Sequence, residues 1–499
     1  MVRSLEVGDS APRSRQAHSL DVLRRFFRES GVYALGTVLG GVVSFVATPV
    51  LARLFSPAEY GALVVAAMFI GFLQAPLSLG IEYSLEVYAF DRGDVPDWQR
   101  LVTSGLTGLL VWAVAVSAVL LAWRGTLAHW LFNADGLETL FVLASAVAVL
   151  QIVLWYFCKL FRVTFRPWSF VVATGLHGPA AVLLGVVVVG LISTSVSAYY
   201  VVAVATTAGA AVFGAWSLRS LVVARWSAAD FGKMLRFGLP LVPSTLLLAV
   251  VPLLDRFFIT RLMGLGEAGV FALGLKVASV VALPLPVVST AYAPHVGRLY
   301  FERGDYAAFL GTLFRLAVPG FAGLALAVIL FRVPLVALFG GPEYAGAATL
   351  VPWLAGAAFF GMVASLINIG FGLRKRTIEV LLLAAAAVAL GCVLNVVLIP
   401  RVGLVGAAWA ALAAQLFLLS VGSARSGALL GARPFDLGIL WKTIILVAAI
   451  SAAAELAPSP RPGRGTAALG AAGLLAYGGG LFALRVIGWR WPLLPRRES

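Results

Sequence analysis

Long, nearly uncharged apolar blocks recur through this chain, each about 20 residues long, the length that crosses a bilayer as a helix. Of the residues, 61% are hydrophobic and 12% are charged, whereas soluble domains are about one quarter charged. Apolar blocks of this length are membrane spans, and in lipid only helices and closed barrels satisfy the backbone polar groups. The blocks do not alternate polar with apolar residues, which excludes a barrel. The sequence therefore predicts an all-α, polytopic membrane protein.

Fourteen transmembrane helices are predicted, and the short connections between them leave no room for a folded domain outside the membrane. The first half should hold helices at 31–51, 61–81, 102–123, 139–158, 170–191 and 197–217. The second half should hold helices at 239–260, 269–290, 313–332, 349–372, 377–398 and 404–421. A last pair is expected at 437–456 and 466–487, and a basic segment, 1–30, precedes the first helix.

Lys and Arg are spread unevenly over the predicted connections. With the N-terminus inside, the inner connections and the two termini carry 26 of them and the outer connections carry 7. Because positive residues are retained in the cytoplasm, the bias predicts an even number of spans with both termini cytoplasmic. It also accounts for the net charge of +15 without nucleic-acid binding. The pair Arg24-Arg25 belongs to this basic flank rather than to a twin-arginine export signal.

Sequence motifs for metal, disulfide or nucleotide chemistry are missing. The two cysteines, Cys158 and Cys392, both lie in apolar runs, so no disulfide framework is expected. The four histidines are scattered without metal-binding spacing, and no P-loop occurs. We therefore expect no cofactor, no metal site and no enzymatic activity.

An internal repeat is visible in the order of the helices. Pro49–Arg53 stands near the end of the first predicted helix, and Pro252–Arg256 stands near the end of the seventh. Both motifs are followed by a similar helix start, Glu59-Tyr60-Gly61 and Glu267-Ala268-Gly269. An offset of six helices keeps the same orientation, so the repeats are parallel about an axis along the membrane normal. This predicts two six-helix lobes, 31–222 and 223–430, with the extra pair in 431–499, an arrangement typical of transporters.

Charged and amide side chains inside apolar helices are candidate functional residues, because burying them in lipid is costly. A net cationic set, Arg53, Arg256 and Lys276, suits an anionic group such as a diphosphate. Asp255 is the candidate for orienting a ligand or coupling an ion. Secondary candidates, which also fit roles at the membrane interface or in contacts between helices, are Glu82, Arg315, Asn368 and Asn395.

Three stretches carry a family resemblance. They are TPVLARLFSPAEYG (48–61), FGLPLVP (237–243) with DRFFI (255–259) and GVF (269–271), and NVVLIPRVGLVGAA (395–408). With them the chain resembles the polysaccharide-biosynthesis flippases of the multidrug/oligosaccharidyl-lipid/polysaccharide exporter superfamily. The resemblance implies two six-helix bundles and a variable final helix pair in the bacterial inner (cytoplasmic) membrane.

The resemblance also implies a function, namely moving an undecaprenyl-diphosphate-linked oligosaccharide from the inner to the outer leaflet by alternating access. Membrane lipid, glycosyltransferases and the polymerase of the same pathway are the implied partners. Murein-precursor flippases typically carry arginines within the first helix and cation exporters often carry an early buried acid. Residues 31–52 hold neither an arginine nor an acid. Two alternatives stay open, a cation-coupled multidrug exporter and a membrane glycan polymerase or ligase, although the outer loops are short for an enzyme.

Overall fold

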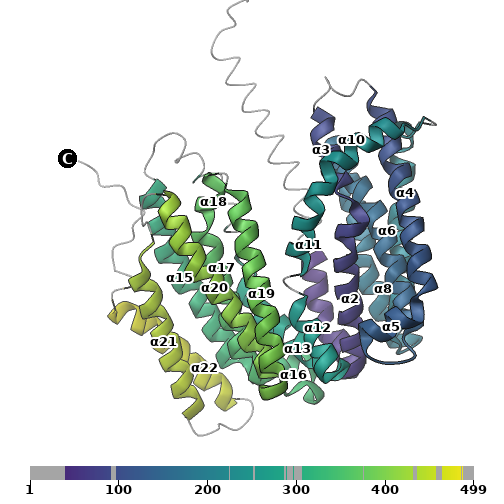
Figure 1. Ribbon diagram of the computed structural model, residues 1–499. Helices are drawn as coiled ribbons and strands as arrows, with labels where there is room; N and C mark the ends of the chain where they lie inside the picture. Colours follow the sequence, from purple (N-terminus) through teal and green to yellow (C-terminus); the bar gives the residue numbers. More distant parts are fainter. Residues whose placement is uncertain are drawn as a thin grey trace, which may run out of the picture. The chain divides into compact units, whose positions relative to one another are not determined.

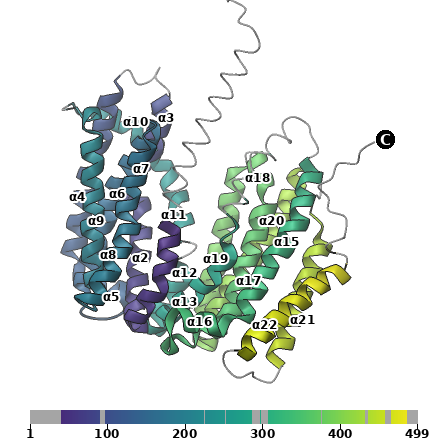
Figure 2. The same ribbon diagram turned by 180° about the vertical axis from the view of Figure 1, so that it is seen from behind.

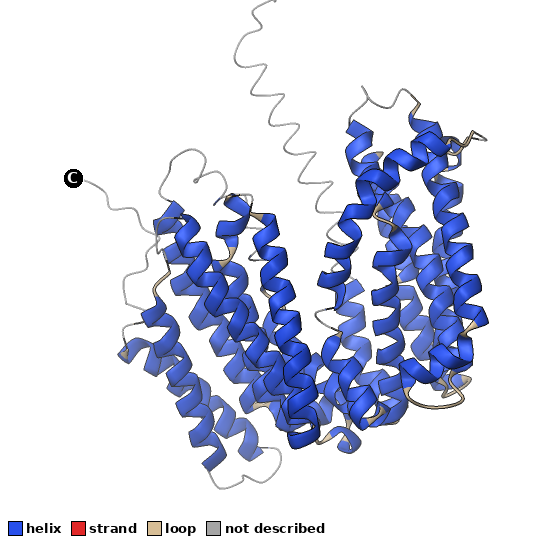
Figure 3. Cartoon of the chain, in the orientation of Figure 1, coloured by secondary structure: helices blue, strands red, loops and turns tan. Residues whose placement is uncertain are grey.

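The computed structural model describes residues 40–90, 97–223, 225–250, 253–285, 306–374, 376–430, 435–456 and 464–484, and the single residues 288, 296 and 486. Within these ranges every regular element is a helix (Figure 3). The predicted head 1–30 and Pro252 of the repeat motif lie outside the described residues, as does most of the tail beyond 484. The all-α prediction is confirmed.

The described residues form two compact units. Unit 1 comprises residues up to Thr48, Leu73–Ala122 and Val142–Val242, and unit 2 comprises Pro49–Phe72, Trp123–Phe141 and the residues from Pro243 onward. The lobe borders predicted from the sequence remain predictions.

Unit 1 is a bundle of long helices capped at one end by short ones. The long helices are α4 (Trp98–Ala122), α6 (Glu138–Val163), the pair α7 (Pro167–His177) and α8 (Pro179–Leu191), and α9 (Val196–Ser217). The short elements are α3 (Ile81–Phe90), η1 (Arg219–Leu221), α10 (Ala228–Gly238) and η2 (Leu239–Leu241). Figure 1 shows α10 lying across the end of this bundle beside α3 and α4.

Unit 2 holds the remaining helices. They are α5 (Arg124–Phe132), α11 (Val242–Val250), α12 (Leu254–Met263), α13 (Leu265–Ala278), η3 (Ser279–Ala282), α15 (Tyr306–Leu330), α16 (Arg332–Gly340), η4 (Pro342–Tyr344), α17 (Ala347–Ile367), α18 (Ile369–Leu373), α19 (Thr377–Val402), α20 (Leu404–Leu430), α21 (Leu437–Leu456) and α22 (Arg464–Ala483). Helix α2 (Pro57–Ser78) falls mostly in unit 2. Helices α17, α19 and α20 pack side by side, and α21 and α22 pack together against α15 (Figure 2).

Eleven described helices are long and apolar enough to cross a membrane, and two shorter apolar helices, Gly40–Leu54 and Ala468–Ala483, accompany them. Each of the thirteen coincides with a predicted span. Large apolar side chains on them face outward, among them Val111 at 66% and Leu191 at 82% exposure, as a lipid-facing surface requires. The chain is a multi-pass membrane protein.

The seventh predicted span, 239–260, is not one helix. It is described as the 3-10 turn η2, then α11, then α12. Pro240 lies in the 3-10 turn and Pro243 in the first turn of α11, where a missing backbone N–H is tolerated. The fifth predicted span, 170–191, is likewise broken at Gly178 between α7 and α8. Average apolarity predicted both spans but could not reveal that their backbones are interrupted.

Helix starts recur at intervals of 208 to 210 residues. Pro57 and Leu265, Arg124 and Arg332, and Val196 and Leu404 lie 208 residues apart, Glu138 and Ala347 lie 209 apart, and Pro167 and Thr377 lie 210 apart. Each copy contains a long helix, α4 or α15, followed by a 9-residue helix, α5 or α16. The repeat seen in the sequence is therefore expressed in the order and length of the helices.

The two copies cross each other through a pair of glycines. A Cβ atom on Gly61 of α2 would lie 1.9 Å from the carbonyl oxygen of Leu265 on α13. A Cβ atom on Gly269 of α13 would lie 2.0 Å from the carbonyl oxygen of Pro57 on α2. Each glycine meets the residue four positions before the other, so the contact is reciprocal. Without a side chain at either position the two backbones approach closely, as in small-residue helix crossings in membranes.

Candidate functional site

A cavity of about 460 Å³ lies inside unit 2, among α12, α13, α17, α19 and α20. Most of its lining is apolar or small. Its polar lining consists of Asp255 and Arg256 from α12, Ser279 from η3, Ser365 from α17 and Gln415 from α20. A volume of this size is in the range of small-molecule sites, and the charged residues on one wall give it a polar side.

Asp255 is tied to the buried amide of Asn395. Asn395 Nδ2 on α19 donates to Asp255 Oδ1 at 2.7 Å and to the Gly391 carbonyl oxygen at 2.9 Å. Asn395 is fully buried, and its Oδ1 atom has no hydrogen-bond partner among the described residues. A carboxylate and an unsatisfied amide oxygen thus lie on neighbouring helices. Both are acceptors, of the kind that bind a proton or a hard cation.

Arg256 supplies the opposite charge to the same cavity. It follows Asp255 on α12, and adjacent helical residues point about 100° apart. Its Nε atom is buried and, within the part of the chain that is described, donates to no acceptor. A buried unsatisfied donor costs about 1–3 kcal/mol, so this N–H is a candidate for bonding to an anionic or carbonyl group of a ligand.

Lys276 adds positive charge close to this arginine. It is half-buried on α13, and the charges of Lys276 and Arg256 interact electrostatically. Its neighbours Leu275 and Ser279 line the cavity, while Lys276 itself does not. The structure thus brings three of the predicted residues, Asp255, Arg256 and Asn395, into one group with Lys276 nearby.

Arg53 occupies a different place. Its side chain is exposed and Nη2 donates to the Leu338 carbonyl oxygen, near the end of α16, at 2.8 Å. The interval of 208 residues matches Arg53 with Arg261 rather than with Arg256. Arg261 makes the corresponding contact in the other copy, to Asn133 Oδ1 at the end of α5, at 3.3 Å. The sequence motifs paired Arg53 with Arg256 at an interval of 203 residues, five fewer than the interval between the matched helix starts.

The remaining candidates are dispersed. Glu82 is half-buried on α3 of unit 1. Arg315 is exposed on α15, with Nη2 at 3.6 Å from Asp436 Oδ2. Asn368 caps the C-terminus of α17, with a buried Oδ1 that finds no partner within the described ranges. None of these three lines the cavity.

A second cavity in unit 2, of about 240 Å³, is lined by apolar side chains. They are Met68, Phe69, Phe72, Trp130, Leu131, Val250, Leu253, Leu254 and Phe257. The rings of Trp130 and Phe257 lie 5.3 Å apart, and the Arg261 guanidinium lies 5.6 Å from the centre of the Trp130 ring. This cavity suits hydrocarbon, with a cation at its edge.

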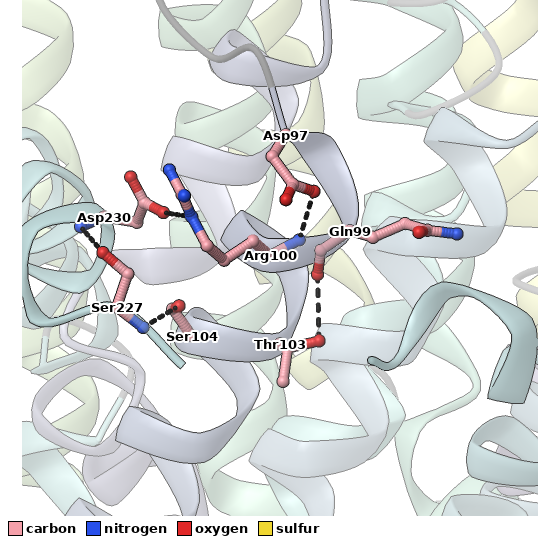
Figure 4. Close-up of polar contacts among 7 residues, drawn as sticks. All are labelled: Asp97, Gln99, Arg100, Thr103, Ser104, Ser227 and Asp230. Carbon is pink, nitrogen blue, oxygen red and sulfur yellow. Dashed lines mark hydrogen bonds and ion pairs between the residues drawn. The ribbon is translucent and has the colours of Figure 1, made fainter. Parts of the chain in front are cut away.

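Sequence reasoning missed a polar cluster that holds the segment after α9 against α4 (Figure 4). Arg100 Nε donates to Asp230 Oδ2 at 2.6 Å, joining the first turns of α4 and α10. The Ser227 amide donates to Ser104 Oγ at 2.9 Å, and Ser227 Oγ accepts from the Asp230 amide. The helix-start signal Ser227–Asp230 was available in the sequence. Gln415 was also missed, because a single amide in an apolar helix is weakly informative.

Comparison with known proteins gives one family and one fold. Residues 50–349 match a family model described as "Polysaccharide biosynthesis protein". No curated protein matches the chain. The lipid II flippase MurJ in an inward closed conformation is similar in structure, with a TM-score of 0.72 at 12% identity, over 90% of this chain and 97% of that one.

Multidrug exporters are similar in structure too. A mutant form of the Vibrio cholerae MATE transporter VcmN gives a TM-score of 0.55 at 14% identity over 82% of this chain and 98% of that chain. An inward-facing multidrug resistance MATE transporter of the MOP superfamily gives 0.52 at 17% identity over 78% and 95%. At such identities the likeness concerns the fold, which is that of the flippases and exporters of this superfamily.

Proposed function

The chain belongs to the family of polysaccharide biosynthesis proteins, and from this premise we propose that it is a flippase for polyprenyl-diphosphate-linked oligosaccharides. It would carry them from the inner to the outer leaflet for cell-surface polysaccharide synthesis. Sugar hydroxyls and a diphosphate cannot cross roughly 30 Å of hydrocarbon unaided, because each unpaired polar group costs several kcal/mol there.

The observation that carries this proposal is Arg256, a cation on the cavity wall whose buried Nε lacks an acceptor in the described residues. A phosphate oxygen would satisfy this donor through a charge-assisted hydrogen bond. Lys276 would add to the attraction, and Arg53 is proposed to act where the headgroup enters or leaves. The apolar cavity beside Trp130 would suit the hydrocarbon part of such an amphiphile.

Asp255 is proposed as the coupling residue. Its hydrogen bond from Asn395 and the unsatisfied Asn395 Oδ1 make a pair of oxygens that a proton or cation would bridge. Binding there would neutralise the carboxylate next to Arg256. The electrostatic potential at an anionic ligand in the cavity would then change. Glu82, Arg315 and Asn368 are proposed to have secondary roles.

The proposed setting is the bacterial cytoplasmic membrane with both termini inside, and the proposed partners are glycosyltransferases and a polymerase of the same pathway. Two lobes, 31–222 and 223–430, would rock about the substrate, with the pair in 431–499 at the periphery. The packing of α21 and α22 against α15 supports such a peripheral place for the pair.

The test is complementation of a deletion strain with substituted chains. Arg256→Ala removes the donor, and we expect surface glycan export to fall about 10- to 100-fold, the equivalent of a charge-assisted hydrogen bond. Arg256→Lys keeps the charge but not the planar set of donors, so its export should lie between that of the unsubstituted chain and that of Arg256→Ala. Glycan on the surface is measured against chain abundance in the membrane.

The matched control is Arg425→Ala. Arg425 is an exposed arginine of the same unit, paired with Glu379 at 2.8 Å on the surface, and its loss should leave export unchanged. Normal export by Arg256→Ala at normal abundance would remove this residue from the mechanism. Normal glycan export by the deletion strain itself would refute the flippase assignment.

A multidrug exporter is the second candidate, favoured by the fold shared with MATE transporters. Against it stands the group of Arg256 and nearby Lys276, two cations against the single carboxylate of Asp255, which disfavours cationic drugs. Drug sensitivity of the deletion strain without a glycan defect would establish the exporter, and accumulation of unpolymerised glycan on the outer leaflet would point to a polymerase or ligase.

A further inference from the structure

Four polar side chains form a continuous hydrogen-bonded chain inside unit 1. Gln74 Nε2 on α2 donates to Gln151 Oε1 on α6 at 3.1 Å. Gln151 Nε2 lies 3.0 Å from His177 Nε2, at the end of α7. His177 Nδ1 lies 2.9 Å from Thr207 Oγ1 on α9. The chain thus links four helices through an apolar interior, where an ionisable residue is a functional candidate by default.

Thr207 fixes the direction of this chain. Its hydroxyl donates to the Ala203 carbonyl oxygen at 2.6 Å, and a hydroxyl has one proton, so toward His177 it accepts. His177 therefore carries its proton on Nδ1, and its bare Nε2 accepts from Gln151 Nε2. Every bond runs from Gln74 toward Ala203. At the open end, Gln74 Oε1 is buried and has no partner in the described part of the chain.

His177 lies at a break in its membrane span. Helix α7 ends at His177 and α8 begins at Pro179, which has no N–H to continue the helical hydrogen bonds. His177 stands ten residues into the 25-residue span Pro167–Leu191, roughly 15 Å from its start at the helical rise. That depth is about half of the hydrocarbon thickness. Interrupted helices at the midplane are where membrane transporters bind their ligands and ions.

The repeat gives this position a counterpart. At an interval of 208 residues Gln74 matches Ala282 and Thr207 matches Gln415, and both of these line the cavity that holds Asp255 and Arg256. The hydrogen-bonded chain of one copy thus corresponds to the charged cavity of the other. The ionisable groups themselves do not match residue by residue, since at this interval Asp255 corresponds to Ala47 and not to His177.

No charged group among the described residues acts electrostatically on His177. Helices α7 and α8 contain no other titratable residue. The titratable residues of the other helices around the chain lie five or more positions, about 7 Å, along each helix from the linked residue. They are Glu138, Tyr156, Cys158, Lys159 and Arg162 on α6, Tyr199 and Tyr200 on α9, and Glu59 and Tyr60 on α2. The helix Gly40–Leu54 carries no member of the hydrogen-bonded chain, and its titratable residue is Arg53 near its end.

We propose that His177 is a proton-binding site of unit 1 and that its charge state sets the direction of the hydrogen-bonded chain. A proton from water binds Nε2, which then becomes a donor. Gln151 must rotate its amide so that Oε1 accepts from His177 and Nε2 donates toward Gln74. Gln74 rotates in turn and gives up the bond from its Nε2 to the Ala148 carbonyl oxygen, 3.3 Å long. Its buried free end then changes from an acceptor, Oε1, to a donor, Nε2.

The consequence is that proton binding and structure are linked in this unit. The conformation described here favours the neutral form of His177, because a charged imidazole without a counter-charge is costly in an apolar interior. Protonation therefore favours a rearranged or hydrated state of the α7–α8 break. This inference stands whatever the protein transports.

Nitrogen NMR of ¹⁵N-histidine in the full chain, held in lipid nanodiscs, tests the proposal. The chain has four histidines, and His177→Gln assigns the signal of interest. At neutral pH that signal should show a protonated Nδ1 and a bare Nε2. On acidification it should convert to imidazolium.

Two substitutions test the roles of the neighbours. Thr207→Val removes the acceptor, so the neutral ring should move its proton to Nε2, whereas Thr207→Ser should retain the Nδ1–H form. Gln151→Leu removes the acceptor for the charged ring and should move the midpoint of protonation down by about one pH unit or more. Thr206→Val is the matched control, because Thr206 bonds only within α9 in the described structure and should leave the spectrum unchanged.

Several results would overturn the proposal. One is a neutral ring with its proton on Nε2 in the unmodified chain. Others are an unchanged midpoint in Gln151→Leu, and a His177 signal that stays neutral down to the pH at which the chain unfolds. None of these outcomes bears on glycan export, so the flippase proposal is tested separately.

Discussion

At the scale of single residues, the candidate site is defined by groups that are left incompletely satisfied. Buried polar atoms in folded proteins almost always have hydrogen-bond partners. In unit 2 the Nε of Arg256 and the Oδ1 of Asn395 have none among the described residues, and both belong to the group around one cavity. This co-location distinguishes them from Arg315, whose exposed ion pair is typical of surfaces.

The Asp255–Asn395 hydrogen bond should show strong coupling in a double-substitution cycle. Asn395→Leu leaves the Asp255 carboxylate without its amide donor, and we expect the free energy of unfolding to fall by about 1–3 kcal/mol. Asp255→Leu together with Asn395→Leu should cost less than the sum of the single changes, because neither partner is then left unpaired. Denaturant unfolding of the purified chain measures this. Additive effects would show that the bond contributes nothing specific.

At the scale of helices, the structure refines what apolar blocks predict. Block length located thirteen spans because a membrane requires about 20 apolar residues whatever the local sequence. The break at Gly178 and the 3-10 turn before α11 were not predicted, because hydropathy averages over a window and proline is tolerated within membrane helices. The short helices α5 and α16 were missed because they are too short to cross a bilayer.

The glycine crossing between α2 and α13 should be intolerant of any side chain. Gly61→Ala and Gly269→Ala each place a Cβ within about 2 Å of a backbone oxygen, which backbone shifts must relieve at a cost of about 1–3 kcal/mol or more. Gly71→Ala and Gly266→Ala are matched controls on the same two helices, since a Cβ there meets no atom within 4 Å. The free energy of unfolding of the four variants, measured in detergent, is compared. Equal stability of all four would contradict the close crossing.

At the scale of the whole molecule, sequence predicted the class and family better than the site. Apolar blocks and three motifs pointed to the right fold and family. The motifs paired Arg53 with Arg256, five residues away from the match with Arg261 that the helix starts give, because a proline followed by an arginine is too common a pattern to fix the register. Grouping Asp255 with Asn395 needed the fold, since 140 positions separate them in sequence.

The topology prediction is checked by cysteine labelling from outside intact cells. In a chain lacking Cys158 and Cys392, the exposed positions Asp135 and Glu343, changed singly to Cys, should react with an impermeant maleimide. Arg225→Cys and Arg376→Cys, also at exposed positions, should react only after the membrane is permeabilised. The opposite pattern would invert the orientation derived from the Lys and Arg bias.

The reciprocal contact of Gly61 with Leu265 and of Gly269 with Pro57 makes this crossing symmetric. A surface that fits its own copy is what a symmetric homodimer presents. The crossing therefore has the form of an isologous dimer interface that is built within one chain. Symmetry at this contact does not extend to the charged residues, because Asp255 and Arg256 in one copy have Ala47 and Thr48 as their counterparts in the other.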